Sequence, residues 1–333
     1  MTFMYDALGV IFGPVMRAIY VLVGNYGLAI ILFTVLYRVL MLPSAISQQK
    51  SMAKNQRTQI KLRKIQERYK DDRQRQQQEI QEFQQREGVN PMGGCSSGML
   101  LQFVLMFGLI AAIYRPIQYT IRGLADGVLG KLTQAAAEVL GDDRLRATDL
   151  RLQLRIVENI DKFKDLIDLK SYEIIRNFAD NFRLFGLDLG KAPSDFTENV
   201  SVFGGMFTLP KSFPSDGSWI YYIIPLLVGI SSIAVSLYTY SRQRKTQPEM
   251  KQNAAMMGCM TFGMPLFSVG IVISFPVGIG MYWIIGSVVQ LLQTVILTHT
   301  HPPQKMLAQL LVEETIVRRS REISRKKIYE MNA

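Results

Sequence analysis

Residues 254–298 read AAMMGCMTFGMPLFSVGIVISFPVGIGMYWIIGSVVQLLQTVILT, a run of 45 residues without a charged side chain. As one helix this run would be about 67 Å long, which is about twice the thickness of a hydrocarbon core. It must therefore fold back, and Ser274-Phe275-Pro276 is the natural corner. The run predicts two membrane-spanning helices joined by a tight turn.

Three further stretches are long and apolar enough to cross a bilayer. They are residues 25–43, which carry only Arg38, and residues 98–114 and 219–240, which carry no charge. We therefore expect an all-α polytopic membrane protein with five spans. Residues 7–23 are also apolar but contain a proline and an arginine, so we expect a helix lying at the interface. A sixth span or an uncleaved signal sequence is the alternative.

The composition agrees with a membrane protein that has substantial polar segments. The chain has 333 residues, 48% of them hydrophobic, and a formal net charge of +11. Its mean hydropathy is +0.12, and the charges gather between the apolar runs. This distribution weighs against DNA binding, which needs a basic face on a soluble fold. No P-loop, dinucleotide fingerprint, zinc-protease or serine-hydrolase motif occurs, so we expect no enzyme activity, no metal and no cofactor.

The charge of each polar segment predicts the orientation of the chain. Residues 45–94 carry 11 Lys or Arg against 6 Asp or Glu, residues 241–253 carry 4 against 1, and residues 299–333 carry 7 against 4. Residues 116–218 carry 13 against 15. With five spans the three basic segments share one side, which the positive-inside rule assigns to the cytoplasm. We expect a bacterial plasma-membrane protein with its N-terminus outside and its C-terminus inside.

The polar segments are predicted to be helical. Residues 44–87 lack Gly and Pro, and Asp71-Asp72 is the expected break of a helical hairpin, which is either a plain connection or a recruiting arm. Residues 116–218 are expected to form an outer cap of amphipathic helices over 117–140, 143–168 and 172–185. The basic tail is expected to contact either anionic lipid or the ribosome. Its cluster comprises Arg318, Arg319, Arg321, Arg325, Lys326 and Lys327.

Arg38 is the most informative single residue. It lies five residues before Pro43 and so about 7–8 Å inside the end of its span. A charge at this depth is costly, and no carboxylate lies in any predicted span to pair with it. Arg38 either extends to the cytoplasmic surface or faces a hydrated cavity, and the sequence alone leaves both open. Gln102 in the next span should face other helices or water, and Tyr282 and Trp283 belong either to an aromatic belt or to the same cavity.

Several motifs together resemble the YidC/Oxa/Alb family of membrane protein insertases. The matching stretches are NYGLAIILFTVLYRVLMLP (25–43), SQQKSMAKNQ (47–56), IQERYKDDRQRQQQEIQEF (65–83), GVNPMGGC (88–95), LFGLDLGKAPS (184–194) and FPVGIGMYWIIGSVVQLLQ (275–293). The resemblance implies five helices around a hydrophilic groove that opens to the cytoplasm. It implies that the groove holds Arg38 and Gln102 and that Trp283 is the aromatic residue near it; we assign the neighbouring Tyr282 to the same groove. It also implies that the hairpin recruits clients, for which we name Lys61, Lys64, Arg68 and Tyr69.

The sequence also departs from the family pattern. Phe103-Val104 follow Gln102 where many relatives have proline, and Gly286-Ser287 replace Ser-Asn. The lack of a large domain before the first core span resembles the shorter, Gram-positive form. The length of residues 116–218 exceeds the usual connection, and the resemblance implies no role for it.

The expected organisation follows in chain order. It comprises an interfacial helix (1–24), a first span (25–43), the hairpin (44–94), a second span (95–115), the outer insertion (116–218), a third span (219–240), a cytoplasmic loop (241–257), the fourth and fifth spans (258–298) and a basic tail (299–333). The expected function is insertion of nascent membrane proteins, with the Sec translocon and the ribosome as candidate partners beside the lipid bilayer. A small anion transporter or channel and a non-inserting assembly scaffold are the alternatives.

Overall fold

The computed structural model describes residues 2–87, 96–142, 145–146, 149–202, 207–212, 214–246, 254–300 and 302–332. The chain divides into two compact units. The first comprises Met1–Val39, Gln102–Arg242 and Met250–Leu291, and the second comprises Leu40–Leu101, Gln243–Glu249 and Leu292–Ala333. Each unit is described in turn.

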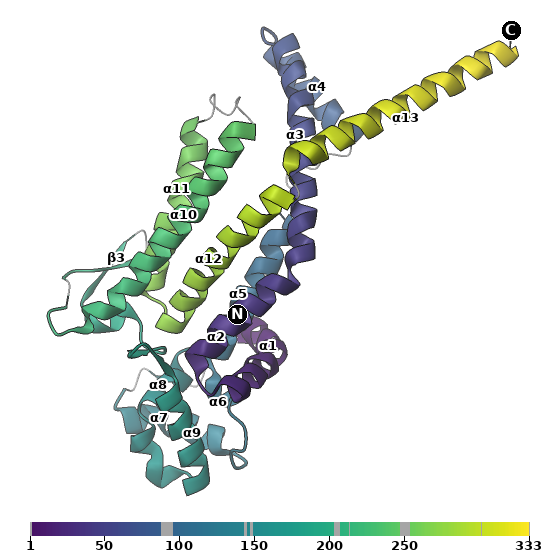
Figure 1. Ribbon diagram of the computed structural model, residues 1–333. Coiled ribbons are helices and arrows are strands. Elements are labelled where there is room, and N and C mark those ends of the chain that lie inside the picture. Colours follow the sequence, from purple (N-terminus) through teal and green to yellow (C-terminus); the bar gives the residue numbers. More distant parts are fainter. Residues whose placement is uncertain are drawn as a thin grey trace. The chain divides into compact units, whose positions relative to one another are not determined.

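The long apolar runs form helices as expected. These are α1 (Thr2–Val23), α2 (Tyr26–Leu40), α5 (Ser96–Tyr114), α10 (Ile223–Thr246), α11 (Ala254–Ile273) and α12 (Val277–Thr300), shown in Figure 1. The predicted corner is confirmed, because α11 ends and α12 begins on either side of residues 274–276. Among the described residues Ser218–Arg242 and Val277–Thr300 are long and apolar enough to cross a membrane, and the bent pair of α2 with Leu42–Gln49 is a third if it counts as one span. The count of five stays a prediction.

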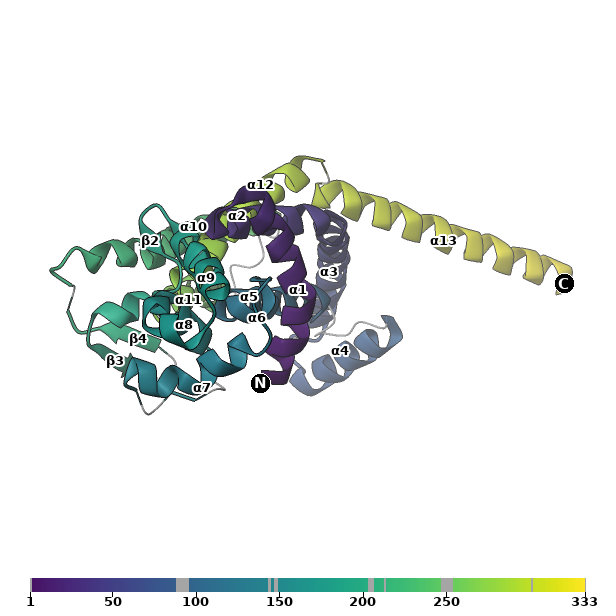
Figure 2. The ribbon, with the colours of Figure 1, turned by 90° about the horizontal axis from the view of Figure 1, so that it is seen from below.

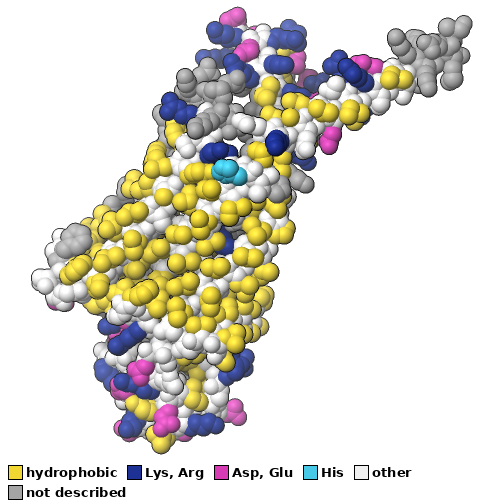
Figure 3. All heavy atoms as spheres, in the orientation of Figure 1, with side chains coloured by type: hydrophobic (Ala, Val, Ile, Leu, Met, Phe, Trp, Pro, Cys, Tyr) yellow, Lys and Arg dark blue, Asp and Glu magenta, His cyan; other side chains and the backbone are white. Residues whose placement is uncertain are grey.

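Glycines bring three of these helices close together in the first unit. A Cβ atom at Gly280 of α12 would lie 2.4 Å from Cγ2 of Ile224 in α10, and one at Gly229 of α10 would lie 2.9 Å from Val269 in α11. Both distances are too short for a real Cβ, so the close approach requires glycine. The outer faces of the same helices are apolar and exposed, as at Leu266, which is 67% exposed. In Figure 3 hydrophobic side chains cover the face formed by α10 and α12, whereas charged side chains gather over α7–α9.

Helix α1 also packs through glycines. It lies against α6 (Pro116–Tyr119), as Figure 2 shows, with Gly9 and Gly13 facing Tyr119. A Cβ at Gly9 would lie 2.4 Å from the Tyr119 ring, and one at Gly108 of α5 would lie 2.1 Å from the Phe12 ring. Helix α1 is therefore a closely fitted part of the first unit.

The segment of residues 116–218 differs from the prediction of helices alone. Its helices are α6, α7 (Val128–Leu140), α8 (Leu152–Glu158) and α9 (Leu169–Asn181), with 3-10 turns at Ile160–Leu166 (η1), Pro193–Phe196 (η2) and Ser218–Tyr222 (η3). The helix predicted over 143–168, part of which lies outside the described residues, is thus shorter and broken. It breaks where the Asn159 side chain donates to the Arg155 carbonyl at 3.0 Å and competes with the helix backbone.

Two small antiparallel hairpins correct the all-α expectation. Strand β1 (Arg183–Leu184) pairs with β2 (Leu187–Asp188), and β3 (Asn199–Val202) pairs with β4 (Phe207–Pro210) in the register Asn199↔Pro210. The first turn places Phe185 and Gly186 at positive φ, 52° and 78°, which suits a tight hairpin. The helix predicted over 172–185 therefore ends early, at Asn181.

An aromatic cluster joins this segment to the membrane helices. Phe178 and Phe182 of the α9 region pack on Tyr26 of α2, with ring centroids 5.2 and 5.1 Å from its ring, and Tyr20 of α1 lies 5.9 Å from it. The Tyr26 hydroxyl is buried and donates to the Ala112 carbonyl at 3.0 Å. The segment therefore shares one core with α1, α2 and α5.

The second unit is a helical hairpin with a long C-terminal helix. Helices α3 (Leu42–Arg68) and α4 (Arg73–Glu87) are separated at the predicted break, and α13 (Pro303–Asn332) packs along α3. Across the hairpin the Tyr69 hydroxyl donates to Glu79 at 3.2 Å, and the Gln76 side chain donates to the Gln66 carbonyl at 2.9 Å. Phe83 is the buried apolar contact of α4.

Candidate functional site

A cavity of about 200 Å³ surrounds Arg38 within the first unit. Four helices supply its walls: α2, α10, α11 and α12. Its lining residues are Arg38, Ser232, Val235, Ser236, Pro265, Ser268, Tyr282, Trp283, Gly286, Ser287 and Gln290. Four serine hydroxyls, one amide and one guanidinium make this a polar cavity between otherwise apolar helices.

Arg38 lies in the last turn of α2 and points toward α12. Its Nη2 atom donates to Oε1 of Gln290 at 3.3 Å. The described residues that line the cavity include no carboxylate. A neutral amide orients the guanidinium without cancelling its charge, so the cavity presents a net positive charge.

The local sequence explains how the guanidinium fits. Thr34, one turn earlier on α2, is buried and donates its hydroxyl to the Ile30 carbonyl at 2.7 Å. On α12, a Cβ atom at Gly286 would lie 3.4 Å from Arg38 Nη2. Alanine at this position would make only an ordinary van der Waals contact with the guanidinium. A longer side chain would take up the space that the guanidinium occupies.

The structure brings together three of the four groove residues expected from the sequence. Tyr282, which is 3% exposed, and Trp283 line the same cavity as Arg38. Gln102 belongs to α5, but its side chain lies outside the described residues.

The sequence analysis missed Gln290 and the four serines. A signal for them existed. Trp283, Ser287 and Gln290 follow one another at spacings of four and three residues, and Ser232 and Ser236 are four apart, so each set shares one helix face. Polar residues at helical spacing inside an apolar span predict a polar cavity.

The hairpin residues occupy two kinds of environment in the second unit. Lys64 and Arg68 are exposed on α3. Lys61 instead forms an ion pair with Glu314 of α13, with its Nζ atom 2.8 Å from Oε1. The other oxygen of the same carboxylate lies 2.7 Å from Nε of Arg57. The side chains of Arg57 and Lys61 hold the pKa of the Glu314 carboxyl down to about 2.

The tail cluster is exposed where the structure describes it. The side chains of Arg318, Arg319 and Arg321 on α13 are exposed to solvent. The Arg318 Nε atom lies 3.0 Å from the Oε1 atom of Glu322, one turn further along the helix. The side chains of Arg325, Lys326 and Lys327 lie outside the described residues. Exposed apolar residues such as Ile316, at 61%, lie on the same helix.

A larger cavity, of about 610 Å³, lies in the segment of residues 116–218. Its three cations are each paired with a carboxylate: Arg151 with Asp195, Arg155 with Asp142, and Lys191 with Glu158. The cations that line this cavity are therefore all paired with carboxylates and offer no unpaired positive charge to a ligand. The smaller cavity around Arg38 is therefore the better candidate site, since its charge faces neutral groups.

Comparison with known proteins gives one family match over most of the chain. The model of the family described as "60Kd inner membrane protein" matches residues 18–305. The chain is also similar to the membrane protein insertase YidC of Granulibacter bethesdensis, with 43% identity over 100 residues, which are 30% of this chain and 17% of the relative. The insertase YidC of Zymomonas mobilis is 42% identical over 99 residues, 30% of this chain and 16% of the relative. The matched stretch thus spans less than a fifth of the length of these relatives.

Proposed function

Because the chain belongs to the 60Kd inner membrane protein family, we propose that it inserts client membrane proteins into a bilayer through the cavity that holds Arg38. The relatives named above are membrane protein insertases, and the resemblance of the sequence motifs points to the same activity. The proposal includes a chaperone role in client folding. It includes no catalytic step and no nucleotide hydrolysis, and no P-loop occurs in the sequence.

One observation carries the proposal: the guanidinium of Arg38 is held by a neutral amide in a serine-lined cavity within the apolar helices. An acidic group in the outer tail of a client is attracted to this charge, which lowers the cost of bringing it part-way across the bilayer. The apolar helix of the client then moves into lipid, which contributes about 0.8 kcal/mol per buried CH₂ group. The membrane potential, which is negative inside, adds to this driving force when the acidic tail of the client moves outward.

The chain is an integral membrane protein with several apolar helices. We place it in a bacterial plasma membrane with five spans, its N-terminus outside and its C-terminus in the cytoplasm. The excess of Lys and Arg in residues 45–94, 241–253 and 299–333 supports this orientation. The groove then opens toward the cytoplasm, on the side from which clients arrive.

The hairpin and the tail are the proposed contact surfaces for partners. Lys64 and Arg68 are exposed and available to a client, whereas Lys61 and Tyr69 are engaged within the second unit and support the arm. The arginines of α13 are proposed to contact the ribosome or anionic lipid. Nascent membrane proteins are the proposed clients, and the Sec translocon is a further candidate partner.

The test is insertion of a single-span client with an acidic outer tail, in cells depleted of any paralogue. Arg38→Ala should block insertion, and Arg38→Lys should be milder because the charge remains. Full insertion by Arg38→Ala would refute the groove mechanism. Solute flux through client-free proteoliposomes would instead support the anion transporter.

A further inference from the structure

Residues 189–191 contact the beginning of α12 through backbone hydrogen bonds. The amide of Val277 donates to the Lys191 carbonyl at 2.9 Å, and the amide of Gly278 donates to the Leu189 carbonyl at 3.0 Å. The first amides of a helix have no partner inside the helix, and in an apolar environment they need one. This loop therefore supplies the N-terminal cap of α12.

The fit at this cap is close. Leu189 is fully buried, and a Cβ atom at Gly278 would lie 3.4 Å from the Leu189 carbonyl oxygen and 3.3 Å from Ile30 of α2. The loop, the first turn of α12 and the wall of α2 thus meet at one point. A displacement of the loop must move at least one of its two neighbours.

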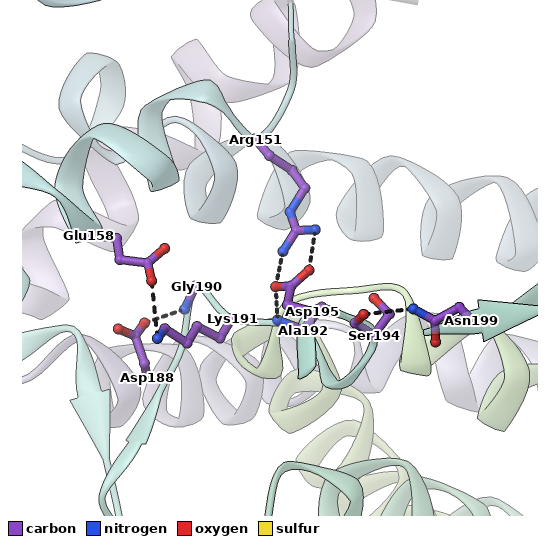
Figure 4. Close-up of polar contacts among 9 residues, drawn as sticks. All are labelled: Arg151, Glu158, Asp188, Gly190, Lys191, Ala192, Ser194, Asp195 and Asn199. Carbon is purple, nitrogen blue, oxygen red and sulfur yellow. Dashed lines mark hydrogen bonds and ion pairs between the residues drawn. The ribbon is translucent and has the colours of Figure 1, made fainter. Parts of the chain in front are cut away.

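A charged clamp holds the loop in place, as Figure 4 shows. Both carboxylate oxygens of Asp195 accept hydrogen bonds from the Arg151 guanidinium, at 2.9 and 2.6 Å. One of these oxygens also accepts from the Ala192 amide at 2.8 Å. Asp195 thereby links α8, whose N-terminal flank carries Arg151, to the residue directly after the cap of α12. A bidentate arginine–carboxylate pair fixes the relative orientation of the two side chains as well as the distance between them.

Two further contacts restrain the same loop. The Lys191 ammonium lies 3.1 Å from Glu158 at the end of α8. The carboxylate of Asp188 accepts from the Gly190 amide at 2.9 Å. The loop is therefore tied to both ends of α8: Lys191 pairs with Glu158 at its C-terminal end, and Ala192 is linked through Asp195 to Arg151 at its N-terminal end (Figure 4).

We propose that the Arg151–Asp195 clamp positions the groove from the outer segment. By fixing the loop of residues 189–192 it fixes the first turn of α12, and with it Tyr282 and Trp283. These two residues begin five positions after Val277, about 8 Å along the same rigid helix. Arg151 and Asp195 do not line the cavity of Arg38, so they are positioning residues. The proposal rests on the proposed function only for its effect on insertion.

The test measures the fluorescence emission of Trp283, whose maximum changes when the surroundings of the indole change. The chain has two tryptophans, so Trp219→Phe leaves Trp283 as the only fluorescent indole. In this background Arg151→Ala and Asp195→Asn should shift the emission maximum of Trp283 and lower insertion of the acidic-tail client by about two- to fivefold, as expected for a partly exposed pair. Asp195→Glu, which keeps a carboxylate that can accept from both the Arg151 guanidinium and the Ala192 amide, should be milder in both measurements.

Arg155→Ala is the matched control. It removes an ion pair with Asp142 from the same segment, at 2.8 Å, without touching the loop, so it should leave the Trp283 emission unchanged. Thermal unfolding of each purified variant separates loss of fold from displacement of α12. Unchanged emission in both Arg151→Ala and Asp195→Asn would overturn the proposal. A shifted emission in a protein whose Arg38→Ala variant still inserts clients would keep the clamp and reject the groove mechanism.

Discussion

Replacing Gln290 by glutamate should close the groove to acidic clients. The change keeps the length of the side chain but places a carboxylate where the amide oxygen now lies, 3.3 Å from Arg38 Nη2. At that distance and an effective dielectric constant of about 20, the Coulomb attraction is about 5 kcal/mol. Desolvation of the new carboxylate offsets part of this, which leaves a net of about 1–3 kcal/mol.

A client carboxylate must compete with this internal pair. Since each 1.4 kcal/mol is a factor of about ten, insertion of an acidic-tail client should fall by about 5- to 150-fold. A client of the same span with an uncharged outer tail should be affected much less, because it does not depend on the charge of Arg38. Protease protection of the translocated tail in proteoliposomes measures both clients in the same preparation.

Gln290→Met separates the two effects of the change. It removes the hydrogen bond to Arg38 but adds no charge, so it should reduce insertion of the acidic client less than Gln290→Glu does. The reasoning fails if Gln290→Glu inserts the acidic client at the rate of the unmodified protein. It also fails if both clients are reduced equally, since that would indicate a damaged fold.

Three other predictions follow from the packing and the charges. Gly280→Ala places a Cβ atom 2.4 Å from Ile224 and should lower the free energy of unfolding by about 1–3 kcal/mol. Gly263→Ala is the control, because open space surrounds that position and the free energy of unfolding should not fall. Thermal unfolding in detergent compares the two variants. The pKa of the Glu314 carboxyl is depressed to about 2, so its ion pairs should support the α3–α13 contact down to about pH 4.5 and weaken between there and pH 2. A distance probe between the helices should show a partial loosening in the unmodified protein, because exposed ion pairs contribute only about 0–1 kcal/mol. Glu314→Gln should remove this pH dependence. Burial raises the pKa of Asp188, so the ionised carboxylate lowers the free energy of unfolding at neutral pH. At pH 7 the Asp188→Asn variant should therefore be at least as stable as the unmodified protein in thermal unfolding. This advantage should shrink as the pH falls toward the raised pKa of Asp188, because the carboxyl then becomes neutral.

The main helices could be predicted from the sequence because their signals are local. The charge-free run with Ser274-Phe275-Pro276 at its centre predicts the corner between α11 and α12, and Asp71-Asp72 predicts the break between α3 and α4. The depth of Arg38 within an apolar run left two positions open, the cytoplasmic surface and a cavity between helices, and the structure shows Arg38 lining a cavity. The β3–β4 hairpin was missed although β-branched residues flank a Gly-Gly pair, a pattern typical of hairpins.

The partners of the charged groups could not be predicted. Arg38 and Gln290 are 252 residues apart, and Arg151 and Asp195 are 44 apart, so only the fold selects them. Residues 116–218, which contain the Arg151–Asp195 pair, have 13 Lys or Arg and 15 Asp or Glu, so many different ion pairs are compatible with the sequence. Choosing among them requires the tertiary structure.

The glycine contacts of α1 have a consequence for how deeply the chain sits in the bilayer. Gly9 and Gly13 leave no space between α1 and Tyr119, and Gly108 leaves none for a shift of Phe12. Tyr119 belongs to the short helix that begins the segment of residues 116–218. Depth in the membrane is thus a shared property of α1 and the start of that segment. A spin label or quencher that reports the immersion of either one reports the immersion of both.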